Sequence, residues 1–320
     1  MTRQQFLEAW IDTPFEGDAL LDFLPHLPKN SVDAAITSPA YPQGGKGRGR
    51  RRPREDSARF RGTMARSEHV QMRPPEDLRR YARRGTAAEQ RERIVAFQHG
   101  KPEHKGEVGL AIRIAAPDWL KWWEPFAKQV LRVLKPGGNF IVNVDTCVWE
   151  RKEKHWAIHS LPERMHRWGF CFADCRIWAK PNGAPITGKG RVRHSWEFVY
   201  HFAKGSDWTI HGASLADCDV FTDPVGLTRW EKYGGVHSAA MPESLARRLV
   251  TFASKPGDIV LDPFLGSGTT MAAAIALGRH GLGAEILPAA AAIARRRVGQ
   301  AVGQIPLIEA PRIDETASLL

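Results

Sequence analysis

The sequence of 320 residues has few cysteines, and it contains no long hydrophobic run. No stretch of about 18 apolar residues and no signal-peptide pattern is present, so we expect a soluble, cytoplasmic protein without a membrane segment. The four cysteines fit reduced, buried thiols better than a disulfide framework. No metal site is expected, because no second ligand pair at suitable spacing accompanies Cys171 and Cys175. The other two cysteines are Cys147 and Cys218.

The net charge of +11 is concentrated in one segment. Residues 42–117 hold 19 Lys and Arg against 9 Asp and Glu, whereas the rest of the chain holds 27 against 26. Such a localised cationic segment suits the neutralisation of nucleic-acid phosphates, although a solvated, disordered loop without a partner has the same composition. The charge is densest at Lys46, Arg48, Arg50, Arg51, Arg52 and Arg54.

Helical and strand-like patterns alternate along the chain, which predicts an α/β architecture. A lysine-proline-glycine-glycine run at 135–138 is expected to separate a helix from a strand. Residues 205–236 have no convincing period and are expected to be irregular. Helices are expected over 20–24, 119–133, 155–168, 242–254, 271–277 and 288–298, and strands over 32–37, 139–144, 175–179, 196–202, 258–262 and 281–286.

A glycine turn follows the strand that ends at Asp262, and an apolar helix follows the turn. This succession predicts a ligand crevice at the carboxyl end of a strand, although Gly-x-Gly is also an ordinary tight connection. It is no phosphate loop, because no lysine follows Gly268, and Met271 stands where a dinucleotide site needs its third glycine. We expect a side chain at Gly268 to fill the ligand's place. Glu285 ends the next strand and is well placed to accept hydrogen bonds from ribose hydroxyls.

Two motifs together resemble the beta group of DNA amino-methyltransferases, in which the catalytic motif precedes the cofactor motif. The string from Asp262 to Thr270, Asp-Pro-Phe-Leu-Gly-Ser-Gly-Thr-Thr, looks like the cofactor motif, and Ser38-Pro39-Ala40-Tyr41 looks like the catalytic motif. The resemblance covers about residues 14–41 and 118–300, with further matches at Gly17-Asp18, 134–138, 178–182 and 237–245. One departure is Ala40, which replaces the family's second proline, so the turn is expected to be less rigid and activity to be reduced or lost.

The resemblance implies a doubly wound, mostly parallel seven-stranded sheet of the Rossmann-like methyltransferase type, circularly permuted. It also implies a basic insert and a small irregular recognition lobe. Residues 205–236 would be this target-recognition segment, although an irregular packing lobe is an equally simple interpretation. The expected division is 1–41 and 118–204 for the catalytic half, 42–117 for a DNA-contacting insert, 205–236 for recognition, 237–300 for the cofactor half and 301–320 for a tail.

S-adenosyl-L-methionine is the cofactor that the resemblance implies. Asp18 would bind its adenine and Glu285 its ribose, although a helix N-cap explains Asp18 as well. The residues implied to contact the cofactor are Asp18, Pro242, Ser244, Asp262, Phe264, Gly266, Ser267, Gly268, Thr269 and Glu285.

The implied substrate is an exocyclic amine of a base flipped out of double-stranded DNA. Tyr41 would stack on the base, while the Ser38 hydroxyl and the Pro39 carbonyl would accept hydrogen bonds from the amino group. Serine at the first motif position favours cytosine N4 over adenine N6. Arg191 and Arg193 would join the six basic residues of the insert at the DNA.

Two alternatives stay open beside adenine methylation. A DNA-binding relic without catalysis is the alternative from another class, and methylation of RNA or a small molecule is disfavoured by the basic insert. A cognate restriction endonuclease is a candidate partner, and the chain could act as a monomer or a homodimer.

Overall fold

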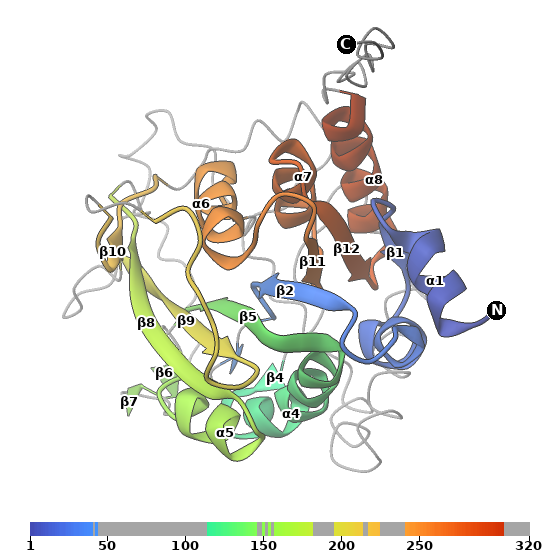
Figure 1. Cartoon of the computed structure of the whole chain (residues 1–320). Helices are drawn as coiled ribbons and strands as arrows, with labels where there is room; N and C mark the ends of the chain where they lie inside the picture. Colours follow the sequence, from blue (N-terminus) through green and yellow to red (C-terminus); the bar gives the residue numbers. More distant parts are fainter. Residues whose placement is uncertain are drawn as a thin grey trace, which may run out of the picture.

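An eight-stranded sheet with helices on both faces forms the centre of the molecule (Figure 1). The strand order is β1-β12-β11-β2-β5-β9-β8-β10, and every neighbouring pair is parallel except those that β9 makes with β5 and β8. The computed structural model describes residues 1–40, 42–43, 114–145, 149–150, 153–154, 157–181, 195–213, 217–224 and 241–303. The expected doubly wound, mostly parallel α/β fold is confirmed.

The sheet has eight strands instead of the expected seven, and the strand at each of its edges is only two residues long. Two further strand pairs lie outside it, a parallel pair of β3 (Pro42–Gln43) with β4 (Ile114–Ala115) and an antiparallel pair of β6 (Trp149–Glu150) with β7 (Glu153–Lys154). In sheet order the strands are β1 (Phe15–Glu16), β12 (His280–Glu285), β11 (Ile259–Asp262), β2 (Val32–Thr37), β5 (Leu134–Val144), β9 (Trp196–Ala203), β8 (Cys171–Ala179) and β10 (Val220–Phe221).

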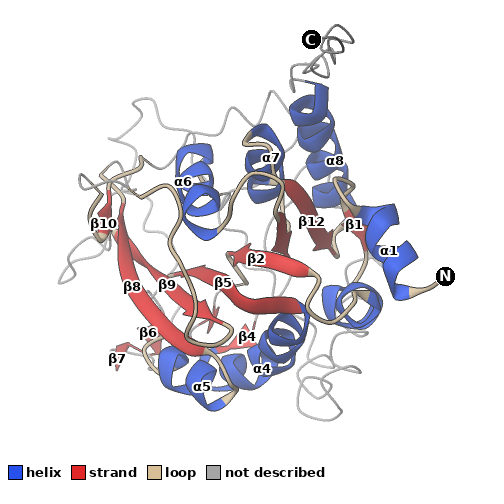
Figure 2. Ribbon diagram, in the orientation of Figure 1, coloured by secondary structure: helices blue, strands red, loops and turns tan. Residues whose placement is uncertain are grey.

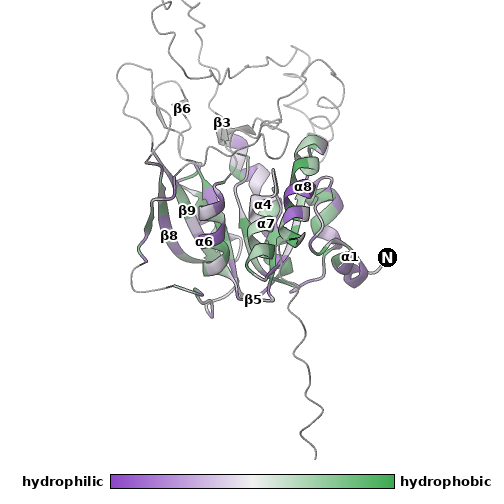
Figure 3. Cartoon of the chain, turned by 90° about the horizontal axis from the view of Figure 1, so that it is seen from above, coloured by the Kyte–Doolittle hydropathy of each residue, from purple (hydrophilic) through white to green (hydrophobic). Residues whose placement is uncertain are grey.

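The helices divide between the two faces of the sheet (Figure 2). One face carries α6 (Glu243–Ala253), α7 (Thr269–Ala276) and α8 (Pro288–Gly303), and the other carries α4 (Ala116–Val133) and α5 (Leu161–Arg167). Strand side chains alternate between the two apolar cores: Ala35 faces α4, whereas Ala34 and Ile36 face α6. Figure 3 shows hydrophilic residues along α1 and α6, in keeping with helices that turn one side to water.

The N-terminal region contains elements that the sequence patterns did not predict. Helix α1 (Arg3–Trp10) begins with a capping box, in which Thr2 and Gln5 each bond the other's backbone N–H. The amphipathic helix expected over 20–24 is instead a short π-type turn, η1 (Ala19–Phe23), followed by a 3₁₀ turn, η2 (Leu24–His26).

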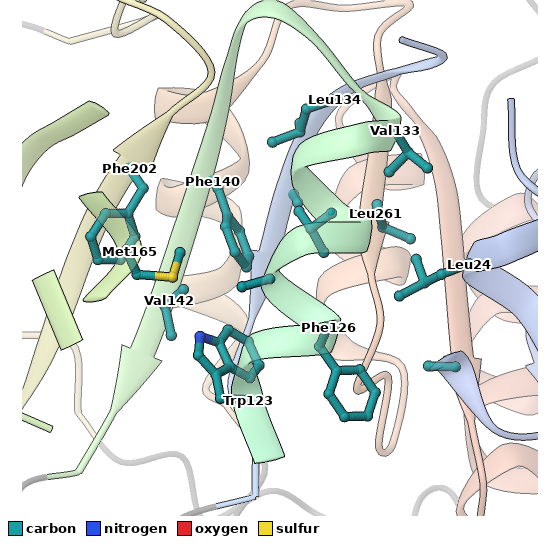
Figure 4. Packing of buried hydrophobic residues seen from close by; sticks show 14 of the residues in the cluster. Leu24, Trp123, Phe126, Val133, Leu134, Phe140, Val142, Met165, Phe202 and Leu261 are labelled. Atoms are coloured by element: carbon teal, nitrogen blue, oxygen red, sulfur yellow. The ribbon is translucent and has the colours of Figure 1, made fainter. Parts of the chain in front are cut away.

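The large core lies between α4 and the sheet, and Figure 4 shows part of it. We expected Leu120, Trp123, Phe126, Val130 and Leu131 to form the buried face of this helix. Leu120 and Leu131 are only half-buried, because the face is rotated by about one residue. The fully or almost fully buried residues are Trp119, Trp123, Phe126, Ala127, Val130 and Val133.

The described part of segment 205–236 packs onto the sheet and onto α6. Its strand β10 pairs with β8, and the Trp178 indole N–H donates to the Asp223 carbonyl over 2.7 Å. Arg248 of α6 forms ion pairs of 3.3 Å with Asp217 and Asp223. Residues 214–216 and 225–236 lie outside the described part, and target recognition by this segment stays a prediction.

Three cysteines are described, and each is a free thiol. Cys171 and Cys175 are half-buried, and the expected burial is wrong for Cys218, which is exposed because it precedes the edge strand β10. Cys147 lies outside the described residues. Within the described ranges, no group of three or more His, Cys, Asp or Glu could hold a metal ion. No described helix combines the length and apolarity needed to cross a bilayer.

Candidate functional site

The carboxyl ends of β2 and β11 lie side by side in the centre of the sheet. From this point β2 is followed by β5 on one side and β11 by β12 on the other. Open α/β sheets bind ligands at such a switch point, in the crevice beyond the strand ends. A buried hydrogen bond joins the two ends: the Thr37 hydroxyl donates to Asp262 Oδ1 over 2.8 Å. The two sequence motifs, 225 residues apart at these positions, are therefore adjacent in space.

Asp262 is fixed by hydrogen bonds and is shielded from solvent. Besides Thr37, the Thr270 side chain and the Phe264 backbone N–H donate to its carboxylate, the latter over 3.0 Å. Burial raises the pKa of Asp262 to about 6, and the three hydrogen bonds oppose this rise. A buried carboxylate with a raised pKa at a strand end is typical of a functional site.

Glu285 shapes the glycine turn from the end of β12. Its two carboxylate oxygens accept backbone hydrogen bonds from Gly266 and Leu287, each over 2.8 Å. Burial raises the pKa of this carboxyl, and backbone hydrogen bonds from Leu287, Gly266 and Ile286 lower it. Each oxygen has a second lone pair, so Glu285 can hold the turn and still accept a ligand hydroxyl.

Asp18 lies next to Glu285 because β1 pairs with β12. The Gly17 N–H donates to the Glu285 carbonyl over 3.0 Å, immediately before Asp18. The Asp18 carboxylate caps η1 by accepting from the backbone of Leu20 at 2.7 Å and Leu21 at 3.1 Å. The N-cap role that the sequence left open is thus present, at a position beside the predicted ribose-binding carboxylate.

Two residues of the glycine turn contact helix α8. Gly268 has φ of +78°, and a Cβ built on it would lie 3.0 Å from both Cα and Cβ of Ala294. This tight contact is with the fold itself, and the expectation that a side chain at Gly268 would fill the ligand's place stays a prediction. The Thr269 hydroxyl accepts a hydrogen bond from Arg297 of α8. A cofactor role for Thr269 stays a prediction.

Pro242 and Ser244 lie at the beginning of α6. This helix leads into the amino end of β11, so its first turn lies at the same edge of the sheet as Asp262. Pro242 is the N-cap residue and is buried, while Ser244 is exposed in the first turn. Ser267 belongs to the same turn as Gly268 and is 5% exposed. The predicted cofactor residues, which come from separate parts of the chain, thus lie at one edge of the sheet.

The predicted catalytic turn is anchored by a residue that the sequence did not single out. Ser38, Pro39 and Ala40 follow β2 directly, and the Ala40 carbonyl accepts a hydrogen bond from Trp119 Nε1 over 2.7 Å. Trp119 lies in the first turn of α4 and is fully buried. Three tryptophans fall within 119–123, but this local pattern does not show which of them contacts the turn, because Ala40 lies 79 residues away. Tyr41, Arg191, Arg193 and the basic residues from Lys46 to Arg54 lie outside the described residues.

Phe264 connects the cofactor motif to the same helix. Its ring lies 4.8 Å from that of Phe126, 5.4 Å from that of Trp122 and 5.8 Å from that of Trp123. Aromatic pairs at these distances add packing energy beyond simple burial. Helix α4 therefore supports both motifs, through Trp119 on one and through this aromatic cluster on the other.

A family model described as DNA methylase, of the N6/N4 type, matches residues 32–296. The chain belongs to this family of DNA methylases. The match spans both motifs and confirms the resemblance to the beta-group amino-methyltransferases. Among relatives, Type II methyltransferase M2.DpnII of Streptococcus pneumoniae is 31% identical over 188 residues, which cover 55% of this chain and 65% of that protein. The chain thus spans less than two thirds of the length of this relative.

Solved structures of methylases share the fold. The PvuII DNA methyltransferase (cytosine-N4-specific) has a TM-score of 0.59 at 18% identity, over 92% of this chain and 94% of its own. The putative DNA modification methylase TTHA0409 of Thermus thermophilus, complexed with S-adenosyl-L-methionine, has a TM-score of 0.53 at 20% identity, over 91% and 95% of the two chains. At these identities the likeness establishes the fold.

Proposed function

We propose that the protein transfers a methyl group from S-adenosyl-L-methionine to the exocyclic amine of a base flipped out of duplex DNA, with cytosine N4 as the preferred target. The observation that carries the proposal is the buried hydrogen bond between Thr37 and Asp262. It holds the start of the Ser38 turn against the start of the glycine turn, so that a base at one and a cofactor at the other would be neighbours. Such proximity can supply a large part of the barrier reduction.

The residues present suit this cofactor chemically. Glu285 offers carboxylate oxygens for hydroxyls at the end of β12, and Asp18 lies beside it. Helix α7 begins at the same edge with Thr269, and the positive end of its dipole favours a ligand carboxylate. A ribose with two hydroxyls and an amino acid end thus meet groups of complementary chemistry. When bound, the cofactor supplies an electrophilic methyl group.

The base would be activated by acceptors at the end of β2. An exocyclic amine is a poor nucleophile because its lone pair is conjugated with the ring. The Ser38 hydroxyl and the Pro39 carbonyl would accept its hydrogens and favour a pyramidal nitrogen whose lone pair faces the methyl group. Acceptors fixed where positive charge develops stabilise the transition state without reorganisation.

Methyl transfer to DNA is the direct test. The purified chain is incubated with mixed-sequence duplex DNA and labelled S-adenosyl-L-methionine, and the digested nucleosides are analysed by mass spectrometry. N4-methylcytosine is the expected product, whereas N6-methyladenine would reassign the target base. Cofactor binding without any methylated nucleoside would favour a DNA-binding relic, and the absence of both would contradict the proposal.

We predict that Ser38→Ala lowers kcat roughly tenfold or more while the Kd for the cofactor stays close to that of the wild type. Loss of one aligned acceptor should cost on the order of 2 kcal/mol or more of barrier, by analogy with lost oxyanion donors. Single-turnover kinetics and calorimetry measure the two quantities. Ser31→Ala is the matched control, because Ser31 precedes the same strand at the opposite edge of the sheet, where its hydroxyl donates to the Pro28 carbonyl. Equal rates in the two variants would contradict the role of Ser38.

A further inference from the structure

The turn after β2 has lost one of the restraints expected for it. Ala40 stands where the family's motif has a second proline, so neither its own φ nor the conformation of Pro39 is restricted by a ring at this position. An unrestrained turn would let the Ser38 hydroxyl and the Pro39 carbonyl drift from the reacting amine. Since misplacement by about 1 Å can cost roughly 100-fold in rate, an active enzyme needs another restraint here.

Trp119 supplies a contact of the required kind. Its indole N–H donates to the Ala40 carbonyl over 2.7 Å, and the side chain is completely buried. A buried hydrogen bond at this distance is well formed, and breaking it would leave a buried donor unsatisfied. The contact links two points 79 residues apart in the chain, so it holds the turn from outside its own segment.

The indole is itself held rigidly. Its ring stacks on that of Trp123 with centroids 5.7 Å apart and planes inclined by 11°. Trp123 is fully buried and packs on Phe140 of β5, with centroids 6.1 Å apart (Figure 4). Helix α4 is therefore anchored on the sheet next to β2, and the hydrogen bond from Trp119 fixes Ala40 relative to this helix.

We propose that Trp119 is the positioning residue of the methyl-transfer reaction, and that its hydrogen bond to Ala40 replaces the second proline of the motif. This inference rests on the function proposed above. Trp119 touches neither base nor cofactor in this account, and it acts through the turn that bears Ser38 and Pro39. Loss of the Trp119 hydrogen bond should therefore lower kcat and leave the cofactor affinity almost unchanged.

Trp123 provides a matched control. It lies one turn further along α4 and is equally buried, but its indole nitrogen has no hydrogen-bond partner among the described residues. Trp119→Phe and Trp123→Phe thus remove the same atoms from stacked neighbours, and only the first removes a hydrogen bond to the turn. Trp119→Phe is expected to lower kcat about tenfold at unchanged KM for the cofactor. Trp123→Phe keeps an aromatic ring against Trp119 and Phe264 and removes no hydrogen bond, so it should lower kcat by clearly less. Equal values of kcat would overturn the inference.

Ala40→Pro tests the replacement directly. The proline keeps the carbonyl and restores the missing restraint, so Trp119→Phe should cost less than threefold in kcat in this background. Should Trp119→Phe not fold, β-(3-benzothienyl)alanine at position 119 keeps the bicyclic shape without the N–H and should show the same loss of kcat. Additive effects of the two substitutions on kcat would overturn the inference.

A failure of the proposed function can be distinguished from a failure of the inference about Trp119. A wild-type chain that methylates no duplex contradicts the proposed function. The denaturant midpoints of wild type, Trp119→Phe, Ala40→Pro and the double variant then still report whether indole and turn are coupled. Additive midpoint shifts would overturn the hydrogen-bonded restraint itself, and non-additive shifts would support it.

Discussion

At Gly268 the positive φ angle and the contact with Ala294 both disfavour a side chain. We predict that Gly268→Ala lowers the free energy of unfolding by about 2–4 kcal/mol, as the sum of backbone strain and overpacking against α8. Gly278→Ala is the control, because Gly278 has φ of +74° but nothing within 4 Å of a built Cβ. Its loss should be near 1 kcal/mol. Chemical denaturation measures both losses of unfolding free energy, and equal losses would show that the contact with α8 contributes nothing.

The pKa of Asp262 makes stability depend on pH in an unusual direction. Its value of about 6 in the folded chain lies above the ordinary 3.8, so the folded state binds the proton more tightly. This contribution is fully present below pH 3.8 and is lost as the pH rises through 6, about 3 kcal/mol in total. Asp262→Asn, which cannot ionise, should therefore gain stability relative to the wild type between pH 4 and 7. Urea denaturation at both pH values measures it, and a constant difference would contradict the raised pKa.

Single residues were predictable where a motif fixed their type and position. Asp262, Glu285 and Ser38 could be named because local spacing places them at strand ends. Thr37 and Trp119 could not, since their partners lie 225 and 79 residues away and only the folded sheet brings them together. From the motif we expected the glycine at 268 for the sake of the ligand alone, because the packing of α8 against this residue cannot be read from the local sequence.

At the scale of elements, a buried polar network fastens β5, β9 and β8 together. His201 bonds Asn139 over 2.9 Å and lies 3.4 Å from an Arg176 nitrogen, while Asn139 donates to the carbonyls of Thr209 and Ala253. Burial, with a further contribution from Arg176, lowers the pKa of His201 to about 4. The network therefore contains a neutral histidine at physiological pH.

We predict that this histidine causes a loss of stability in acid. The folded-state pKa is depressed, so the contribution is present above pH 6.5 and is lost as the pH falls through 4, about 3 kcal/mol in all. Replacing His201 with Gln removes the titration, although it costs stability at pH 7. The difference in unfolding free energy between wild type and variant should thus shrink from pH 7 to pH 4. An unchanged difference would mean that His201 has the same pKa in the folded and the unfolded chain.

Elements were predictable where periodicity was strong and unbroken. Strand β2 has the predicted bounds, and β9, α6 and α8 agree to within a few residues at their ends. Strand β5 begins five residues before the predicted 139, because Leu134 already pairs with Val32 of β2. The Lys135–Gly138 run has no partner in the register, which passes directly from Leu134 to Asn139, and Gly137 has φ of +77°. The run therefore keeps its local turn propensity as an irregularity inside the strand.

For the whole molecule, the distribution of charge leads to a prediction about DNA. Residues 42–117 carry nearly all of the net charge, and they follow the predicted catalytic turn directly. Replacing Arg50, Arg51, Arg52 and Arg54 with Ser should weaken DNA binding and lower the salt slope of log K by up to about 0.9 for each lost phosphate contact. Sequence preference and cofactor affinity should stay unchanged. Titrations of two unrelated duplexes at several salt concentrations test this, and an unaltered slope would leave the arginines without a phosphate contact.

The pairing of β3 with β4 gives the molecule a modular construction. Pro42 pairs with Ile114 and Gln43 with Ala115, so the residues that bracket the basic insert are next-door neighbours. The pair is parallel, so a linker must carry the chain from the end of β3 back to the start of β4, which takes about a dozen residues. We expect the insert to behave as an exchangeable cassette: a chain joined from Gln43 to Ile114 by such a linker should keep its fold and its cofactor affinity while it loses most of its affinity for DNA. Grafting the cassette of another methylase between the same two residues should then transfer that protein's DNA affinity and leave the cofactor affinity unchanged.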